Sequence, residues 1–291
     1  MDRRSFLISL PFAVGSPLFF RNTPLGIFYS QDDDALICTK KFELAVSLGL
    51  RTKPIGDVIV EIGKSFLGVD YIANLLEQPG AERLVVNLRG LDCVLFCENA
   101  LVFARCVKKN KMTFDDYKAD LQYVRYRGGI INQYPSRLHY FSDHIYDNEK
   151  KGVVKNVTKE IGGVPFRKTV NFMSTHPDSY IKLKENPDFV AVIQKQEEAI
   201  NKRTMYHIPK DQVQKVASRI QNGDIIAITT DIDGMDVSHT GIAVWENDSL
   251  HLMHAPLSGH RVQITEKTLA DYLAANKKQL GIMVARPLES A

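Results

Sequence analysis

The sequence predicts an α+β fold, in which helices dominate the first part of the chain and strands the last part. Apolar residues recur at helical spacing up to about residue 221, and β-rich segments separated by turn residues follow from residue 224. The 291 residues, 44% of them hydrophobic, can bury a sizeable core. No repeat, low-complexity tract or linker interrupts the pattern, so we expect one mature domain over residues 32–291.

The early helices have recognisable start signals. They are expected over residues 39–50, 54–66 and 92–108, and from Thr113 onward. Thr39 is read as an N-cap and Pro54 as a first-turn proline. Asp92 is a good N-cap for the third helix, which is apolar nearly all round and therefore belongs in the core. Asp116 follows Thr113 in a loose capping box.

The middle of the chain is less regular. "VTKEIGGVPFRKTVNFM" alternates well enough to predict a hairpin turned at Gly162 and Gly163. Two helices are expected after it, over residues 187–202 and 209–221, with Gly223 ending the second. The aromatic-rich insert over residues 126–186 gives no clear fold.

The last part predicts an antiparallel sheet packed on the buried third helix. Its strands are expected at "DIIAITT", "HTGIAVW", "SLHLMHA", "RVQIT" and "GIMVARPL". A helix over residues 266–277 precedes the final strand.

The N-terminus resembles an export signal. Arg3 and Arg4 precede an apolar run from Phe6 to Phe20, which prolines and glycine interrupt, so it is too short and too broken for a comfortable membrane span. "RRSFL" also resembles the twin-arginine signal of bacteria. We expect residues 1–31 to be a signal peptide and the protein to be exported to the periplasm, without a stable membrane span afterwards. A cytosolic N-terminal arm is the alternative.

Charge and composition limit the partners. A net charge of +3, dispersed along the chain, does not predict nucleic-acid binding. No CxxC pair occurs, and no metal or cofactor is expected. "DIDGMD" resembles the start of a calcium loop, but Met235 and Gly234 stand in the wrong places, so it is read as a turn with Asp236 as a support for the site. The oligomeric state stays open.

Three cysteines lie on the expected third helix, and their depth along it separates them. Cys93 is in the first turn after Asp92, where free backbone N–H groups and the helix dipole favour a thiolate and could stabilise an oxyanion. Cys97 and Cys106 lie deeper and are read as packing residues. The sequence therefore predicts Cys93 as a nucleophile.

A thiol nucleophile needs an imidazole and a group that orients it. His239 begins one strand, and the next strand brings His251 and His254 close. His254 shares a face with Leu250 and Leu252, and we expect this face to be the core-facing side, at the rim of the buried helix. This alternation favours His254 over His251, unless a bulge reverses it.

These residues resemble the NlpC-type family of bacterial cell-wall cysteine hydrolases, which have a papain-like α+β fold. "LDCVLFCENAL" is similar to the family's Asp-Cys helix start, and "DVSHTGIAV" with "HLMHA" is similar to its two histidine strands. The resemblance implies Cys93 as nucleophile, His239 as general base and His254 as the orienting residue. "LGVDYI" resembles the family's glycine-tyrosine segment and offers Tyr71 near the oxyanion.

Departures from the family point to one branch of it. The usual Cys-Ser-Gly is Cys93-Val94-Leu95 here, and compact members lack the large insert. Together these resemble the N-acetylmuramoyl-L-alanine amidase-like branch, formerly a domain of unknown function. That branch implies cleavage of the lactyl–L-alanine amide of small, soluble muropeptides with an anhydro sugar end, in peptidoglycan recycling.

Substrate contacts and alternatives complete the prediction. Arg137, His139 and Tyr140 are candidate contacts to a sugar-peptide, since a cation and aromatic rings suit it; packing of the insert is an equal alternative. A γ-D-glutamyl endopeptidase would use the same cysteine and histidines on another bond. An inert wall-binding module is the non-enzymatic alternative.

Overall fold

The computed structural model describes residues 31–290, so the expected signal peptide lies almost wholly outside the described residues. The first helix, α1, spans Gln31–Ser47 and begins well before the predicted start. Thr39 is not its N-cap, because the Thr39 hydroxyl donates to the carbonyl of Ala35 in mid-helix. The acidic residues that open α1 supply a better first turn than Thr39.

The next three helices agree with the sequence prediction. They are α2 at Ile55–Lys64, α3 at Cys93–Lys108 and α4 at Phe114–Arg125. Asp92 caps α3 by accepting hydrogen bonds from the backbone of Val94 and Leu95. Thr113 and Asp116 form the capping box of α4.

The last part of the chain forms an antiparallel sheet, as predicted. Its later strands are β6 at Ile225–Thr230, β7 at Val237–Glu246, β8 at Ser249–His254, β9 at Gln263–Ile264 and β10 at Gln279–Pro287. Short strands β3 at Val154–Asn156, β4 at Val164–Pro165 and β5 at Tyr206–Pro209 join them. The order is β4-β5-β10-β6-β7-β8-β9, with β3 also on β10.

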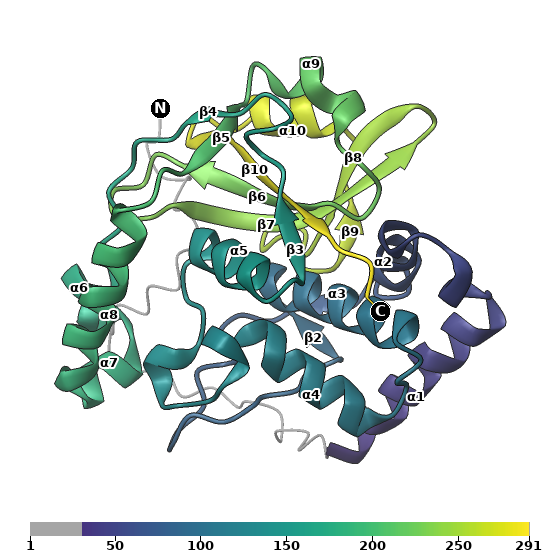
Figure 1. Cartoon of the computed structure of the whole chain (residues 1–291), viewed down its shortest axis with the longest axis horizontal. Helices are drawn as coiled ribbons and strands as arrows, with labels where there is room; N and C mark the ends of the chain where they lie inside the picture. Colours follow the sequence, from purple (N-terminus) through teal and green to yellow (C-terminus); the bar gives the residue numbers. More distant parts are fainter. Residues whose placement is uncertain (1–30, 291) are drawn as a thin grey trace, which may run out of the picture.

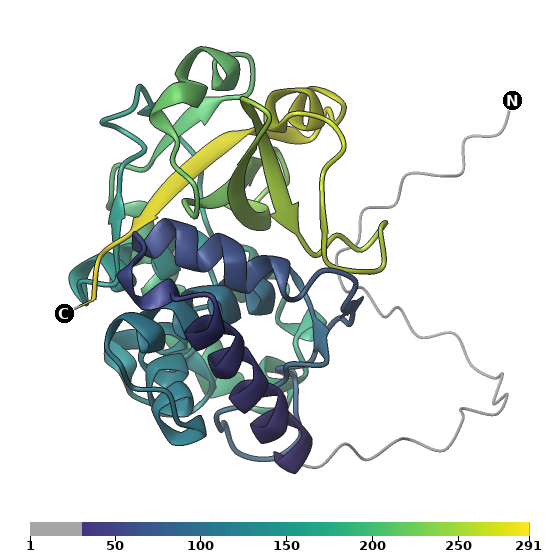
Figure 2. The same cartoon turned by 90° about the vertical axis from the view of Figure 1, so that its right-hand side faces the viewer.

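Helices cover both faces of this sheet (Figure 1). Helices α2, α3 and α5, the last at Phe141–Lys150, lie on one face, where residues such as Ile242 and Met253 join the main core. On the other face, α9 at Val213–Val216 and α10 at Leu269–Ala274 cover a second core. Figure 2 shows α1 and α2 packed outside α3, so that α3 is enclosed on all sides as its apolar surface requires.

Two predictions about the middle of the chain are wrong. Gly162 and Gly163 do not turn a hairpin, because β3 before them pairs with β10 and β4 after them pairs with β5. The helix expected over residues 209–221 is only α9 followed by a single 3₁₀ turn, and its expected first residue, Pro209, belongs instead to β5, which pairs with β10. In both places long-range pairing outweighs local propensity.

The end of the insert and the segment that follows it form three helices beside the sheet. These are α6 at Phe172–Thr175, α7 at Ile181–Glu185 and α8 at Pro187–Asn201, of which only α8 was predicted. They share a third apolar cluster with a 3₁₀ turn at Tyr134–Ser136. A two-stranded parallel pair, β1 at Asp70–Tyr71 and β2 at Gly90–Leu91, leads into α3. Over residues 31–290, no helix is long and apolar enough to cross a membrane.

Candidate active site

A cavity of about 190 Å³ opens where the start of α3 meets the start of β7. Cys93 and His239 both line it. Residues from the insert form the opposite wall, among them Tyr134, His139 and Tyr140. The structure therefore brings the expected nucleophile and base, which are far apart in sequence, to one cavity, and we call it the Cys93 cavity.

The Cys93 thiol is half-buried at the first turn of α3. Burial raises the pKa of Cys93 to about 12, the Asp92 charge raises it further, and hydrogen bonds from Thr240 work in the opposite direction. The expectation of a thiolate below the usual pKa is therefore wrong for the free protein. The resting group is a neutral thiol, whose proton has to be removed during reaction.

The start of α3 has fewer free backbone N–H groups for an oxyanion than expected. The Asp92 carboxylate accepts from the Val94 N–H at 2.9 Å and from the Leu95 N–H at 2.8 Å. These two donors are therefore not free for an oxyanion. The first-turn backbone N–H of Cys93 is not taken up by the Asp92 cap; it hydrogen-bonds to the Cys93 thiol and acts to lower the thiol pKa.

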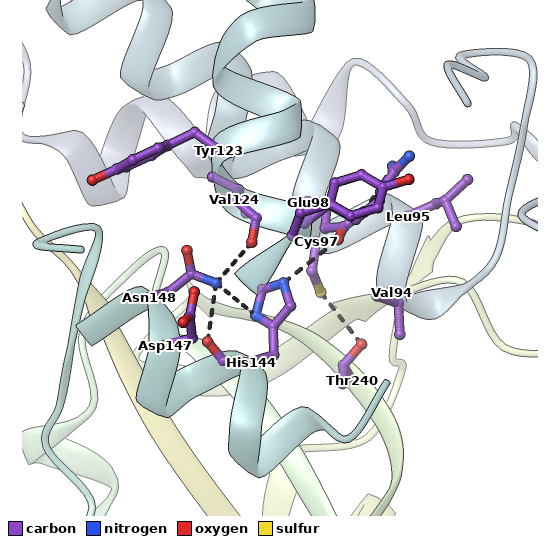
Figure 3. Close-up of polar contacts among 12 residues, drawn as sticks. Val94, Leu95, Cys97, Glu98, Tyr123, Val124, His144, Asp147, Asn148 and Thr240 are labelled. Carbon is purple, nitrogen blue, oxygen red and sulfur yellow. Dashed lines mark hydrogen bonds and ion pairs between the residues drawn. The ribbon is translucent and has the colours of Figure 1, made fainter. Parts of the chain in front are cut away.

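Thr240 links helix α3, which carries Cys93, to strand β7, which carries His239. Its hydroxyl donates to the carbonyl of Cys93 at 2.9 Å, and the Cys97 thiol donates to that same hydroxyl at 3.6 Å. Figure 3 shows the Thr240 and Cys97 side chains meeting between α3 and β7. Thr240 directly follows His239, so this contact fixes the position of Cys93 relative to the imidazole.

His239 is held by His254, as the strand alternation predicted. His239 Nε2 lies 2.8 Å from His254 Nδ1, whereas His251 Nδ1 faces the backbone carbonyl of Thr265 at 2.8 Å. The expectation that this face lies at the rim of α3 is wrong, because Leu250 and Leu252 pack in the second core, on the face of the sheet opposite α3. The pairing of β6 with β7 shifts register at Ser238, and such a bulge can re-aim the side chain that follows it.

Both imidazoles of this pair are neutral near pH 7. Burial lowers the pKa of His239 to about 4. Burial lowers the pKa of His254 to about 3, with the neighbouring His239 as a second cause. The ring of Tyr272 stands edge-on to His254, with 5.3 Å between ring centroids. A neutral His239 is the form that can accept a proton.

Tyr71 is the last residue of β1. Because it pairs with Leu91, which shortly precedes α3, it lies beside the start of that helix. Burial raises the pKa of Tyr71 to about 12, and the charges of Cys93 and Asp92 raise it as well. Its phenol therefore stays protonated and can act as a donor near the thiol.

Arg137 does not line the Cys93 cavity, and its place contradicts a role as substrate contact. The side chain is buried and its guanidinium pairs with Glu77 at 2.7 Å and lies 3.6 Å from Glu82. It also donates to the carbonyl of Leu76. The cation is thus neutralised inside the protein and holds Glu77 at the cavity wall.

His139 and Tyr140 do line the Cys93 cavity. His139 Nε2 lies 3.0 Å from the Tyr134 carbonyl, and burial lowers the pKa of His139 to about 3. The Tyr140 hydroxyl donates to Glu197 at 2.6 Å and accepts from the backbone of Met173 at 2.8 Å. Both polar ends are engaged in the insert, so their rings shape the wall.

A buried polar cluster supports α3 one turn below the site (Figure 3). Glu98 pairs with Arg125 at 2.8 Å and lies 3.5 Å from His144 Nε2. Burial alone would raise the pKa of Glu98, but Arg125 and His144 outweigh it and lower the pKa to about 2. Asn148 contacts His144 Nδ1 at 3.2 Å. This cluster ties α3, α4 and α5 together.

Asp236 lies in the cavity wall with both carboxylate oxygens engaged. They accept from the backbone N–H groups of Ser142 and Val237, at 2.8 and 2.7 Å. Burial raises the pKa of Asp236. Over residues 31–290, no group of three or more His, Cys, Asp or Glu side chains could hold a metal ion.

Sequence reasoning did not find Thr240, Tyr134 or Tyr272. Thr240 could have been noticed, since it follows His239 and alternation directs it towards α3. Tyr134 and Tyr272 lie in the insert and on α10, and only the tertiary fold brings them to the site.

Comparison with solved structures finds close relatives. An N-acetylmuramoyl-L-alanine amidase from Bacteroides uniformis is 34% identical over 80% of this chain and 98% of its own, with a TM-score of 0.77. A candidate xylanase from Bacteroides fragilis is 38% identical over 77% of this chain and 98% of its own, with a TM-score of 0.74. A Legionella pneumophila protein of family DUF1460 shares the fold at 21% identity and a TM-score of 0.69, over 89% of this chain and 95% of its own.

A search of curated proteins finds no match. The family model described as AmiA-like, N-acetylmuramoyl-L-alanine amidase-like, matches residues 61–282, a span that contains Cys93, His239 and His254. With that match and the close structural relatives, the chain belongs to the N-acetylmuramoyl-L-alanine amidase-like family.

Proposed function

We propose that this protein is an NlpC-type cysteine amidase with a papain-like site, which cleaves the lactyl–L-alanine amide of small muropeptides with an anhydro sugar end. The observation that carries the proposal is the placement of Cys93 and His239 in one cavity, with His239 held by His254 at 2.8 Å. The family description and the Bacteroides uniformis amidase support the substrate class.

The hydrogen bond between the histidines decides which nitrogen acts as base. If His239 Nε2 carries its proton and donates to His254 Nδ1, then His239 Nδ1 keeps a free lone pair. This nitrogen takes the Cys93 proton as sulfur attacks the lactyl carbonyl. His239 then gives the proton to the departing L-alanine amine, and water, activated by the same nitrogen, releases the acyl group from sulfur.

Two donors can stabilise the oxyanion of this reaction. The Cys93 backbone N–H, which the Asp92 cap does not take up, is the first. The Tyr71 phenol, which stays protonated, is the second. The oxyanion would thus be stabilised by one backbone N–H and one phenol, and not by the several free N–H groups that an uncapped helix start would offer.

The name of the Bacteroides fragilis relative suggests another chemistry, and the cavity does not favour it. Glycosidases use two carboxyl groups as acid and base. In the cavity wall, Asp236 has both oxygens engaged and Glu77 is paired with Arg137. The thiol and imidazole are the reactive pair.

The expected export would place the enzyme in the periplasm, where muropeptides arise from wall turnover. This part of the proposal depends on the signal-like residues 1–31, which contain the twin-arginine-like "RRSFL".

The test is product analysis by mass spectrometry with defined muropeptides, reducing and anhydro. The amidase releases a free sugar lactyl acid and an intact peptide that begins with L-alanine. A product in which sugar and L-alanine stay joined would instead identify the γ-D-glutamyl endopeptidase. Cys93→Ala should abolish turnover, whereas the matched Cys106→Ala should keep it, because Cys106 is buried near the far end of α3, away from the site. Turnover by Cys93→Ala, or none by wild type, would refute the cysteine amidase.

A further inference from the structure

The residues that lead into α3, residues 87–91, connect the two oxyanion donors, and we call them the β2 segment. They run directly into Asp92 and Cys93, so their path sets the direction of the Cys93 N–H. Their last two residues form β2, which pairs with β1 and thereby places Tyr71 opposite Leu91. A displacement of the β2 segment would therefore move the backbone donor and the phenol relative to each other.

Close packing couples the β2 segment to β1. A Cβ atom built on Gly90 would lie 2.3 Å from Cδ1 of Ile72, the residue after Tyr71. The Ile72 N–H also donates to the Leu91 carbonyl at 3.3 Å. The other edge of β1 is held separately, since the Tyr71 N–H donates to the carbonyl of His260 at 2.8 Å. Tyr71 is therefore supported from two sides, and the β2 segment is one of them.

The first helix, α1, holds this segment through one buried carboxylate. Oδ1 of Asp34 accepts from the Leu88 N–H at 3.0 Å and from Nε of Arg89 at 3.1 Å, and Oδ2 accepts from Nη2 of Arg89 at 2.8 Å. The Asp34 side chain is 3% exposed. A charge-assisted fork of this kind fixes orientation as well as distance, because both carboxylate oxygens are engaged.

Helix α3 holds the beginning of the same segment. The side-chain amide of Asn99 donates to the Asn87 carbonyl at 3.2 Å, and Oδ1 of Asn87 accepts from the Gly90 N–H at 3.0 Å. Asn99 lies within residues 61–282, which the family model matches, whereas Asp34 and the whole of α1 lie before them. The match therefore gives α1 no role, although α1 contacts the segment that leads to the nucleophile.

We propose that Asp34 is a positioning residue of the site. From α1 it holds the β2 segment so that the Cys93 N–H and the Tyr71 phenol converge on the same oxyanion. Its effect passes through Leu88 and Arg89, since these residues accept no part in the chemistry and lie between Asp34 and Cys93 in the chain of contacts. The inference rests on the proposed amidase function, and it makes α1 part of the catalytic unit.

The kinetic test uses the full chain and an anhydro muropeptide. Asp34→Ala should lower kcat by about ten- to hundredfold and leave KM within about twofold, because misaligned oxyanion donors lose interactions made in the transition state. Asp34→Asn keeps an oxygen for the Leu88 N–H and should recover most of this loss. Rates are divided by the amount of folded protein, so that partial unfolding does not mimic the effect.

Asp224→Ala is the matched control for a purely structural role. Asp224 is equally buried, accepts from the Gln221 N–H at 2.9 Å and forms a fork with Arg286 at 2.9 and 2.7 Å, but it does not line the Cys93 cavity. Its loss should lower the thermal midpoint as Asp34→Ala does, yet keep the wild-type kcat. An equal fall in kcat for both variants, or a wild-type kcat for Asp34→Ala, would overturn the positioning role.

A spectroscopic measurement separates this inference from the proposed function, because it needs no turnover. Fluorotyrosine incorporated into the protein gives ¹⁹F resonances, and Tyr71→Phe identifies the one from Tyr71. Asp34→Ala should shift this resonance, whereas Asp34→Asn and Asp224→Ala should leave it close to the wild-type position. A shift in a protein that cleaves no muropeptide supports the positioning role and counts against the amidase alone. An unshifted Tyr71 resonance in Asp34→Ala refutes the positioning role, whatever the protein cleaves.

Discussion

At the scale of single residues, the site depends on hydrogen bonds that fix side-chain orientation. The contact of His239 Nε2 with His254 Nδ1 leaves His239 one free ring nitrogen at the cavity. Asp92 uses the first helical N–H groups for its own cap, which leaves the Cys93 N–H as donor. A neutral thiol and a neutral imidazole, rather than an ion pair, are the resting state.

His254 can be tested as a positioning residue. His254→Leu removes the acceptor for His239, so kcat should fall by about 10²–10³ because the base nitrogen is no longer fixed. His254→Asn keeps an acceptor oxygen and should recover most of this loss. The thermal midpoint of both variants serves as control for folding. Equal kcat of the two variants would show that His254 does not act through its hydrogen bond.

At the scale of elements, the reactive geometry is set where α3 crosses β7. Thr240 is the direct link, since its hydroxyl donates to the Cys93 carbonyl. The sequence predicted α3, its Asp92 cap and the two histidine strands, because capping and strand alternation are local properties. It did not predict the strand β5, because these four residues pair with distant segments, β10 and β4, which no local pattern shows.

Replacing Thr240 tests this link. Thr240→Val removes the hydroxyl at nearly equal volume, so we expect a loss of about 1 kcal/mol in the free energy of unfolding. The fall in kcat should be about tenfold, as Cys93 shifts relative to His239. Thr240→Ser keeps the hydroxyl and should stay close to wild type in kcat. Urea unfolding and steady-state kinetics measure the two effects, and a Thr240→Ser variant as impaired as Thr240→Val would contradict the hydrogen-bond role.

At the scale of the whole molecule, folding shifts the pKa values of several buried ionisable groups. Burial lowers the pKa of His139 to about 3, of His239 to about 4 and of His254 to about 3. Burial raises the pKa of Asp92 to about 6. The first three groups bind protons more readily after unfolding, and Asp92 less readily.

These pKa shifts predict that the folded protein loses stability below about pH 6.5, where the imidazoles of the unfolded chain begin to take up protons. Each of the three imidazoles removes about 1.4 kcal/mol per pH unit from the free energy of unfolding, until pH falls through its folded pKa. Between pH 6 and 4, Asp92 releases a proton on unfolding and so offsets the proton that one imidazole takes up. Unfolding near pH 5 is therefore accompanied by a net uptake of about two protons. The slope of urea-unfolding free energies between pH 5 and 7 measures this. Stability that is flat or rises as pH falls would contradict it.

Local capping and strand alternation were enough to predict the α+β order, the capped buried helix that carries Cys93 and the two strands that carry His239 and His254. The chemistry around these residues depends on contacts that form only in the folded chain. Arg137 is neutralised by acids from another segment, and the thiol of Cys93 is protonated because burial outweighs the helix terminus. Charge pairing and desolvation depend on neighbours from distant parts of the chain, which no local pattern encodes.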